Sequence, residues 1–195
     1  SNALVQELQK AIPQTDGGID IDARPTTATI GEEEDPIQNS LWKNQYDIVH
    51  VITSRFMIYQ PDLVHLGKAR LDLFRTFTLP SIQKQTTKEF LWIIYTDPNL
   101  NPLLREPLVE LVKDEPNVLV LGMNRARFDD FRNKTWMEDV HTVFSGSHEL
   151  LKDYHAAAQQ RVFVNSRVDA DDAVYLNFCS SVQQQTAKAL GETAR

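Results

Sequence analysis

Four short runs of apolar residues punctuate the chain, and each predicts a buried strand. The runs span Tyr46–Ile52, Phe90–Tyr95, Asn117–Met123 and Val162–Val164. They contain few polar alternations, which is typical of strands that are covered on both faces in a parallel sheet. Polar residues follow every run, so each predicted strand has a defined carboxyl end.

Helical spacing of apolar residues separates these runs. It covers residues 68–85, 102–113, 148–160 and 173–190. Pro80 and Pro107 fall inside the first two of these helices and predict a kink or a break, because proline removes a backbone donor. Strands and helices therefore alternate, which predicts an α/β fold with a mostly parallel sheet and helices on both faces.

Two segments lack this regular pattern. Residues 1–45 combine sparse large apolar side chains with clustered turn formers, and predict an irregular or disordered arm, with an arm packed along the domain as the alternative. Residues 1–3 (Ser-Asn-Ala) resemble a remnant of tag cleavage. Residues 124–147 predict a long loop, either a solvated excursion or a lid that carries basic groups. Residues 46–195 then form the α/β domain.

Composition narrows the classes of function. The chain has 195 residues, a net charge of -7 and a pI of about 5.2. This acidic balance argues against binding of nucleic acid through a large positively charged surface. Cys179 is the only cysteine, so neither an intramolecular disulfide nor a cysteine-based zinc site is available. No apolar run has the length of a transmembrane helix. We expect a cytoplasmic protein.

The main candidate for chemistry is an acidic turn after the fourth apolar run. It contains Asp169, Asp171 and Asp172 within four residues. Crowded carboxylates repel each other, and a hard divalent cation such as Mg²⁺ or Mn²⁺, shared with substrate phosphates, removes that conflict. The alternative is a turn that only caps the next helix, because aspartate favours that position.

Other polar residues are predicted at the same edge of the sheet. Arg55 follows the first strand, Arg70 lies near the start of the next helix, and Asp97 follows the second strand. Right-handed crossovers bring the carboxyl ends of parallel strands together, so residues 53–55, 97 and 169–172 are expected to share one cleft. Arg55 is either a phosphate contact or a capping arginine, and Asp97 either binds a nucleoside or caps a helix. Neither a dinucleotide-binding nor a P-loop glycine motif is present.

Four segments in this order resemble a known group of enzymes. They are TSRF (53–56), LFRTFTLPSIQKQT (73–86), FLWIIYTD (90–97) and NSRVDADDAV (165–174). With the D-x-D turn, they resemble GT-A glycosyltransferases, whose fold is Rossmann-like, and more specifically the putative rhamnosyltransferase family. The resemblance covers residues 46–185.

The resemblance implies a nucleoside-diphosphate sugar as donor and Mn²⁺ or Mg²⁺ as cofactor. Asp97 would contact the nucleoside, and Asp169 and Asp171 would form the D-x-D pair at the metal, with Asp169 acting directly or through ribose or water. Asp172 would contact the metal ligands without binding the metal itself, or cap the next helix. Arg55, Arg70 and Arg167 would contact the diphosphate.

The resemblance also implies what to expect of the acceptor side. GT-A enzymes usually continue beyond the D-x-D helix into strands that shape the acceptor pocket, whereas only a helix and a short tail follow here. We therefore expect a domain without the C-terminal acceptor half, either because the chain is truncated or because the protein carries only the donor-binding half. No residue of the chain is identifiable as the catalytic base, and a position beyond residue 195 is one candidate.

Three functions follow from these observations. The first is a metal-dependent glycosyltransferase that transfers a sugar, rhamnose being one candidate, to an unknown acceptor such as a glycan or lipid-linked glycan. The second is a nucleotide-binding fragment or degenerate member without transferase activity. The third is a phosphohydrolase of the haloacid dehalogenase type, whose D-x-D motif also follows a strand.

Overall fold

The computed structural model describes residues 44–123 and 131–193 of the chain. All of them belong to one compact unit, Pro36–Arg195. The arm predicted over residues 1–45 lies outside the described residues, apart from its last two.

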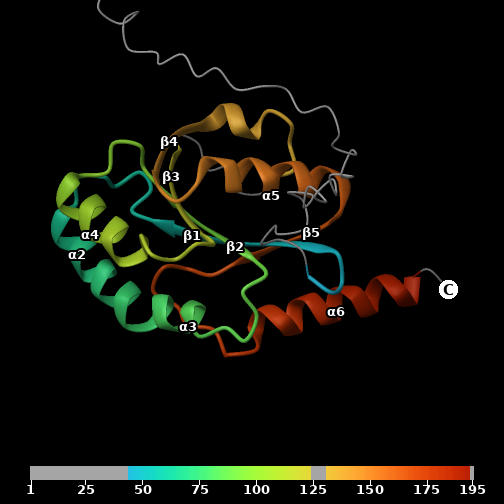
Figure 1. Ribbon diagram of the computed structural model, residues 1–195. Coiled ribbons are helices and arrows are strands. Elements are labelled where there is room, and N and C mark those ends of the chain that lie inside the picture. Colours follow the sequence, from blue (N-terminus) through green and yellow to red (C-terminus); the bar gives the residue numbers. More distant parts are fainter. Residues whose placement is uncertain (1–43, 124–130, 194–195) are drawn as a thin grey trace, which may run out of the picture. The chain divides into compact units, whose positions relative to one another are not determined.

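The described residues form a five-stranded sheet (Figure 1). Its strands are β1 (Ile48–Phe56), β2 (Leu91–Thr96), β3 (Val118–Met123), β4 (Val140–Ser145) and β5 (Val162–Arg167). They lie in the order β4-β3-β2-β1-β5, and only the β3–β4 pair is antiparallel. The predicted α/β class with a mostly parallel sheet is confirmed.

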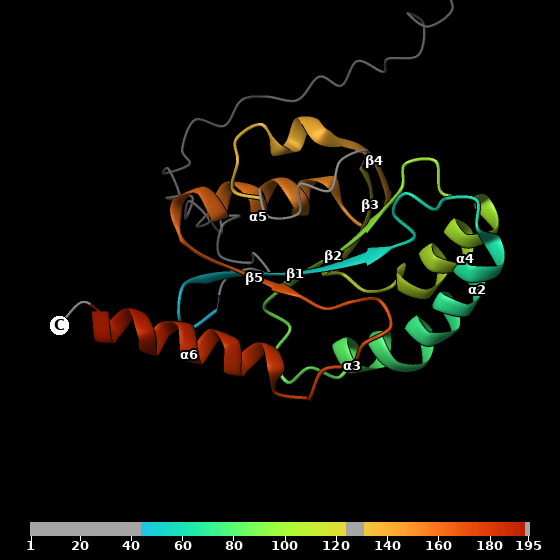
Figure 2. The same cartoon turned by 180° about the vertical axis from the view of Figure 1, so that it is seen from behind.

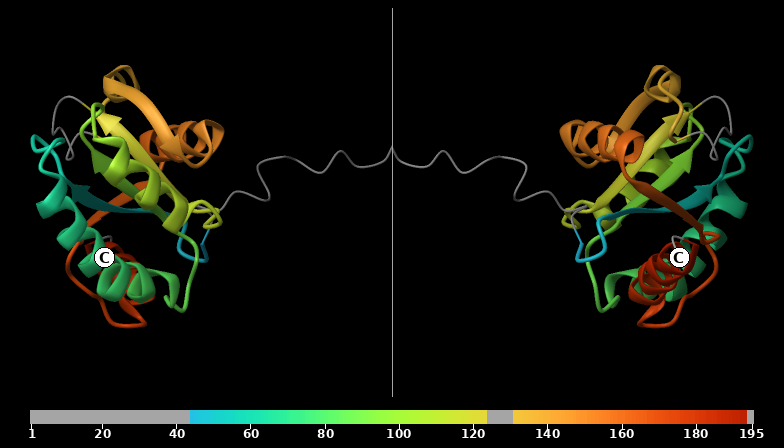
Figure 3. Two further views of the ribbon diagram at one scale, coloured as in Figure 1. Left: turned by 90° about the vertical axis from the view of Figure 1, so that its left-hand side faces the viewer. Right: turned by 90° about the vertical axis from the view of Figure 1, so that its right-hand side faces the viewer.

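Helices cover both faces of this sheet. They are α2 (Val64–Leu73), the π-helix η2 (Phe74–Thr78), α3 (Leu79–Gln83), α4 (Pro102–Val112), the 3-10 helix η4 (Trp136–Asp139), α5 (His148–Gln160) and α6 (Phe178–Thr193). Figures 1 and 2 show α5 on one side of the sheet and α2, α3 and α4 on the other. The turned views in Figure 3 place α6 on the side opposite α5.

Alternating side chains of each central strand supply the two cores. On β2, Trp92 and Ile94 pack on the α2–α4 side, while Ile93 and Tyr95 pack on the α5 side. The Trp92 ring stacks on Phe74 of the π-helix, with 5.6 Å between ring centroids. β2 is buried along its whole length, which explains why its sequence reads as one continuous apolar run.

The two prolines have different consequences. The expected interruption near Pro80 takes the form of the π-helical turn η2, after which α3 begins with Pro80 in its first turn, where a missing N–H is tolerated. The predicted break at Pro107 is wrong, because α4 runs through it. Pro107 and Leu103, whose carbonyl loses its helical partner, are both exposed, so water can reach that carbonyl.

The long loop predicted over residues 124–147 is wrong for its second half. Residues 136–145 form η4 and the edge strand β4, and Phe131 and Trp136 are buried in the core on the α5 side. Residues 124–130 lie outside the described part of the chain. The last helix is also shorter than predicted, because α6 begins only at Phe178.

His50 joins the first strand to its neighbours β5 and α6. Its side chain is fully buried, with Nε2 2.9 Å from Ser166 Oγ and Nδ1 3.5 Å from the Gln183 amide nitrogen. Because the Gln183 amide donates to Nδ1, the ring proton lies on Nε2 and is donated to Ser166. Burial lowers the pKa of His50 from 6.5 to about 4, so the folded protein keeps this ring neutral.

We predict that stability falls as the pH drops through the range between these two pKa values. Between pH 6.5 and 4 the unfolded chain binds a proton that the folded chain rejects, which favours unfolding. The unfolding free energy should fall by about 2 kcal/mol from pH 7 to pH 5 because of His50. Urea titrations of the wild type and His50→Gln at both pH values test this. An equal loss in the two proteins would contradict it.

A second prediction concerns the turn between β4 and α5. Gly146 has a φ of 93°, and an added Cβ would lie 2.5 Å from the Val118 carbonyl oxygen. Gly146→Ala should lower the unfolding free energy by roughly 1–3 kcal/mol, because the backbone conformation and the contact are both unfavourable. Gly191→Ala is the control, since an added Cβ on α6 meets nothing within 4 Å. That variant should be neutral or more stable by up to about 1 kcal/mol, and equal effects would contradict the prediction.

Candidate functional site

The sheet order creates a crevice at the carboxyl ends of β1 and β5. From β1 the chain proceeds outward through β2, β3 and β4, and then returns to add β5 on the opposite side of β1. The connecting helices lie on opposite faces at this point. In open α/β sheets, ligands bind at such a reversal of strand order, outside the carboxyl ends of the strands.

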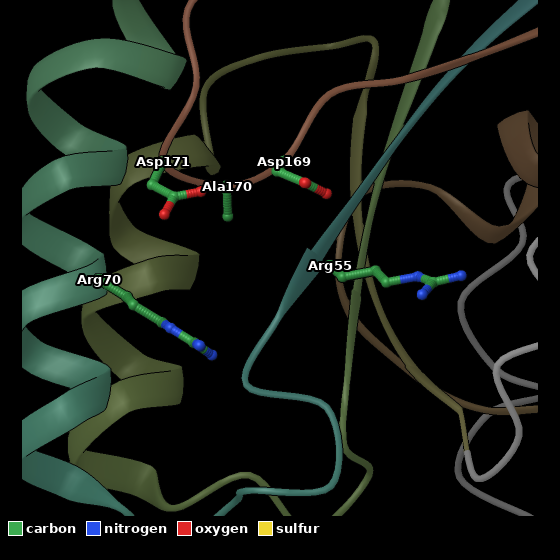
Figure 4. A pocket seen from close by; sticks show the side chains of 5 residues that line it. All are labelled: Arg55, Arg70, Asp169, Ala170 and Asp171. Carbon is green, nitrogen blue, oxygen red and sulfur yellow. The ribbon is translucent and has the colours of Figure 1, made fainter.

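A pocket of about 290 Å³ lies at this position (Figure 4). Its lining residues are Arg55, Arg70, Asp169, Ala170 and Asp171. Arg55 comes from the end of β1, Arg70 from α2, and the other three from the turn after β5. Four residues singled out in the sequence therefore border one pocket, although their roles stay predictions.

Backbone and hydroxyl hydrogen bonds fix the acidic turn to the sheet. The Val168 N–H donates to the Thr53 carbonyl at 3.0 Å, and the Ser54 hydroxyl donates to the Val168 carbonyl at 2.6 Å. The Trp92 indole N–H in turn donates to the Ser54 oxygen at 3.0 Å. Both peptide groups of Val168 are thus paired immediately before Asp169, so the start of the turn cannot shift without breaking buried hydrogen bonds.

Asp169 is paired with an arginine of its own strand end. The Nε and one terminal nitrogen of Arg167 donate to the same oxygen, Oδ1, at 3.2 and 3.1 Å. Both side chains are about half exposed, so the pair contributes little to stability. Arg167 is not among the residues that line the pocket. Its predicted diphosphate contact stays a prediction, and the contact that the structure shows is the one to Asp169.

Arg70 and Arg55 differ in where their guanidinium groups point. Figure 4 shows the Arg70 side chain directed into the space below Asp171, whereas the Arg55 side chain extends away from both. One terminal nitrogen of Arg70 donates to Gln60 Oε1 at 3.4 Å and to Met57 Sδ at 3.6 Å. Both contacts are long, and a guanidinium carries five N–H donors, so Arg70 retains capacity for an anion.

Asp97 lies one residue beyond β2 at the same edge of the sheet, but it does not line the pocket. Its Oδ1 accepts the Asn99 N–H at 2.9 Å, which closes a tight turn. The suggestion that it caps the next helix is wrong, because Asn101 caps α4 by accepting the Leu103 N–H.

The capping alternative for the acidic turn is also wrong. The Asp172 N–H donates to the Asp169 carbonyl at 3.1 Å, which folds residues 169–172 into a turn. Helix α6 begins only at Phe178, so none of these aspartates lies at its first turn. The carboxylates of this turn therefore do not cap a helix.

The donor set of the pocket suits a hard divalent cation. Asp169 and Asp171 present carboxylate oxygens, the ligand type that Mg²⁺ and Mn²⁺ prefer. Among residues 44–123 and 131–193, no group of three or more His, Cys, Asp or Glu side chains is placed to hold a metal by itself. The two carboxylates fit a cation whose other ligands come from phosphate and water, as is usual for Mg²⁺.

A cysteine nucleophile is excluded by its surroundings. Cys179 is fully buried near the start of α6, and burial raises the pKa of its thiol to about 12. The thiol therefore stays protonated and inaccessible.

Sequence reasoning missed the residues that position the site. Ser54 and Trp92 hold the acidic turn, and Gln60 and Met57 contact Arg70. A buried serine at the end of an apolar strand is the one signal that could have indicated Ser54, because a buried hydroxyl needs partners.

Comparison with protein families gave a match over most of the chain. A family model described as "Putative rhamnosyl transferase" matches residues 44–195 of the chain. No curated protein and no solved structure matched. Within the described residues, no helix has the length and apolar character needed to cross a membrane.

Proposed function

The chain belongs to this family of rhamnosyl transferases, and on that premise we propose that it is a metal-dependent glycosyltransferase that uses a nucleoside-diphosphate sugar. The pocket at the carboxyl ends of β1 and β5 is the proposed donor site. The observation that carries this proposal is the meeting of Arg70 with Asp169 and Asp171 around one pocket.

The mixed charge of the pocket favours a particular kind of ligand. A bare anion would be repelled by the two carboxylates, and a bare cation would be repelled by the arginines. A diphosphate that binds together with a divalent cation satisfies both groups, because its oxygens face the arginine while the cation faces the aspartates. This combination is the polar part of a nucleoside-diphosphate sugar.

The residues of the acidic turn would share the cation unequally. Asp171 is the proposed direct ligand. Asp169 already accepts two hydrogen bonds from Arg167 at Oδ1. Its carboxylate would bind the cation directly, bind it through a metal-bound water, or accept a hydrogen bond from the ribose. When bound, Mn²⁺ or Mg²⁺ would supply positive charge to the diphosphate oxygens of the leaving group.

The other residues have supporting parts in this proposal. Arg70 would bind the diphosphate and offset its charge as the bond to the sugar weakens. Arg55, at the end of β1, is a second candidate for the diphosphate, although its side chain points away from Arg70. Asp97 would bind the nucleoside from the end of β2, and Asp172 would support the turn through its N–H bond to Asp169.

Binding without transfer is the competing function. Of the residues that the structure describes, those that line the pocket include no histidine and no third carboxylate beyond the two assigned to the cation, so none of them is a separate base. Incubation of the purified chain with donor, followed by detection of free sugar and nucleoside diphosphate, separates the two functions. Sustained release of sugar favours the enzyme, and binding with no release favours the competing function.

We predict that Asp171→Asn weakens the binding of nucleoside diphosphates in the presence of Mn²⁺ by about tenfold or more, because one charged metal ligand is lost. Calorimetric titration with ADP, CDP, GDP, UDP and dTDP, with and without Mn²⁺, measures this effect. Asp172→Asn is the matched control, since it makes the same change at the next residue, which does not line the pocket.

The comparison of Asp171→Asn with Asp172→Asn decides whether the proposed site is correct. Wild-type binding that does not depend on Mn²⁺, or equal losses in Asp171→Asn and Asp172→Asn, would contradict the proposed site. Absence of binding by a well-folded wild-type chain would also contradict it.

A further prediction concerns the diphosphate. Arg70→Gln should weaken nucleoside diphosphate binding by roughly tenfold, because a charge-assisted contact is lost, and should leave binding of the bare nucleoside unchanged. Arg75→Gln is the control, since Arg75 is exposed in the following π-helix and pairs with Asp72. If Arg70→Gln weakens binding of the bare nucleoside as strongly as binding of the nucleoside diphosphate, Arg70 does not contact the phosphates.

A further inference from the structure

The loop between β1 and α2 contains two residues in an unfavourable backbone conformation. Met57 and Tyr59 have φ values of 55° and 63°, in the left-handed region that residues other than glycine and asparagine rarely adopt. Neither position carries a glycine that would relieve the strain. Such strain persists only where the surrounding structure enforces it, and it is common at ligand sites.

The surrounding contacts do enforce it. Met57 is 1% exposed and anchors the loop in the core, and the Gln60 N–H donates to the Met57 carbonyl at 3.2 Å. One residue later, the Pro61 carbonyl accepts the Asn101 N–H at the start of α4, also at 3.2 Å. The loop is therefore held on both sides of Tyr59, and this rigidity fixes the direction of its side chain.

Despite this rigid support, Tyr59 packs into no core. Its side chain is 69% exposed, and Leu63, at the start of α2, is 51% exposed. Leu63 also occupies the N-cap position, where a polar side chain would cap the helix, and it makes no capping hydrogen bond. Positions that break local rules without a structural gain are expected at functional sites.

This loop contacts one of the residues that line the donor pocket. Arg70 lines the pocket, and its guanidinium donates to Met57 and Gln60, the two residues that flank the turn containing Tyr59. The arginine proposed to hold the diphosphate is thus in contact with the loop that presents the tyrosine. The loop is therefore a candidate contact for a group attached to the diphosphate, or for one that approaches the diphosphate for reaction.

We propose that the Tyr59 ring is a stacking platform for the pyranose ring of a sugar, either the donor sugar or a saccharide acceptor. The inference rests on the proposed function. A pyranose ring has an apolar face of C–H groups and a rim of hydroxyls. The tyrosine ring has an apolar face and a polar tip, so the two surfaces match without burying an unpaired polar group. Leu63 is a second exposed apolar side chain at the end of the same loop.

The test compares sugar-loaded and sugar-free ligands on three variants. Tyr59→Asn removes the ring and suits the left-handed backbone, Tyr59→Phe keeps the ring, and Tyr175→Asn removes another exposed tyrosine, on the segment before α6. Calorimetry with each nucleoside diphosphate and its glucose or rhamnose conjugate gives the preference for the sugar-loaded form. A second titration adds free rhamnose or glucose to the protein saturated with nucleoside diphosphate and Mn²⁺.

Tyr59→Asn should lower the preference for the sugar-loaded over the sugar-free ligand, or the affinity for the free saccharide, by about three- to tenfold, which is the range for one aromatic contact. Nucleoside diphosphate binding and the melting temperature should not fall. Tyr59→Phe and Tyr175→Asn should match the wild type. A loss confined to the conjugate assigns the platform to the donor sugar, and a loss confined to the free saccharide assigns it to the acceptor.

Two outcomes overturn the inference while the proposed function stands. In one, Tyr59→Asn binds both kinds of sugar as the wild type does. In the other, Tyr59→Phe or Tyr175→Asn loses as much as Tyr59→Asn. Failure of the proposed function is a separate result, because it would show as lost or metal-independent binding of the nucleoside diphosphate itself.

Discussion

The hydroxyl of Ser54 is the interaction on which the geometry of the site depends. It is buried, accepts a hydrogen bond from the Trp92 indole and donates one to the carbonyl of Val168. One small group thereby connects β2, β1 and the start of the acidic turn. Loss of this oxygen would leave a buried N–H and a buried carbonyl without partners, which costs more than the two hydrogen bonds contribute. Carboxylates that repel each other need such an anchor to stay in place before a cation arrives.

The parallel sheet explains why the anchor and the chemistry lie at the same edge. β5 pairs with β1 in register from Ile48–Val162 to Thr53–Arg167, so the residues that follow both strands emerge side by side. The helices that connect the strands leave this edge open at the β1–β5 boundary, because they pass to opposite faces there. The arrangement brings together Arg55 and Asp169, which are far apart in the sequence, without any contact between their side chains being needed for folding.

Much of the fold was predictable because it follows from burial on two faces. β2 and β3 are buried throughout, so their sequences are continuous apolar runs and their limits were predicted within a residue. β4 is an antiparallel edge strand with a weaker pattern and was missed. The start of α6 was predicted too early because Val174 keeps helical spacing with Phe178. In the structure the Val174 N–H donates to the Ser81 hydroxyl of α3, and Val174 is not helical. A tertiary hydrogen bond there overrides the local pattern.

The site was predictable in its position and less so in its contacts. The carboxyl ends of parallel strands must meet, which is why Arg55 and the acidic turn share a pocket. Asp97 and Arg167 were expected at the same ligand, which stays a prediction, and the structure shows a short-range partner that competes for each of them: the Asn99 N–H for Asp97 and Asp169 for Arg167. Spacing in the sequence carries no information on such competition, because it depends on side-chain direction.

Several local irregularities of the structure lie close to Arg70 in the sequence. The left-handed residues Met57 and Tyr59, the uncapped start of α2 at Leu63 and the π-helical turn that ends α2 all flank Arg70 along the chain. Each is less regular than the usual alternative, although Met57 and, in the π-helical turn, Phe74 also pack into the core. Selection for stability alone would favour glycine or asparagine at position 59 and a capping side chain such as aspartate at position 63. Their closeness to Arg70, which lines the pocket, supports the proposal that this segment contributes to the binding site.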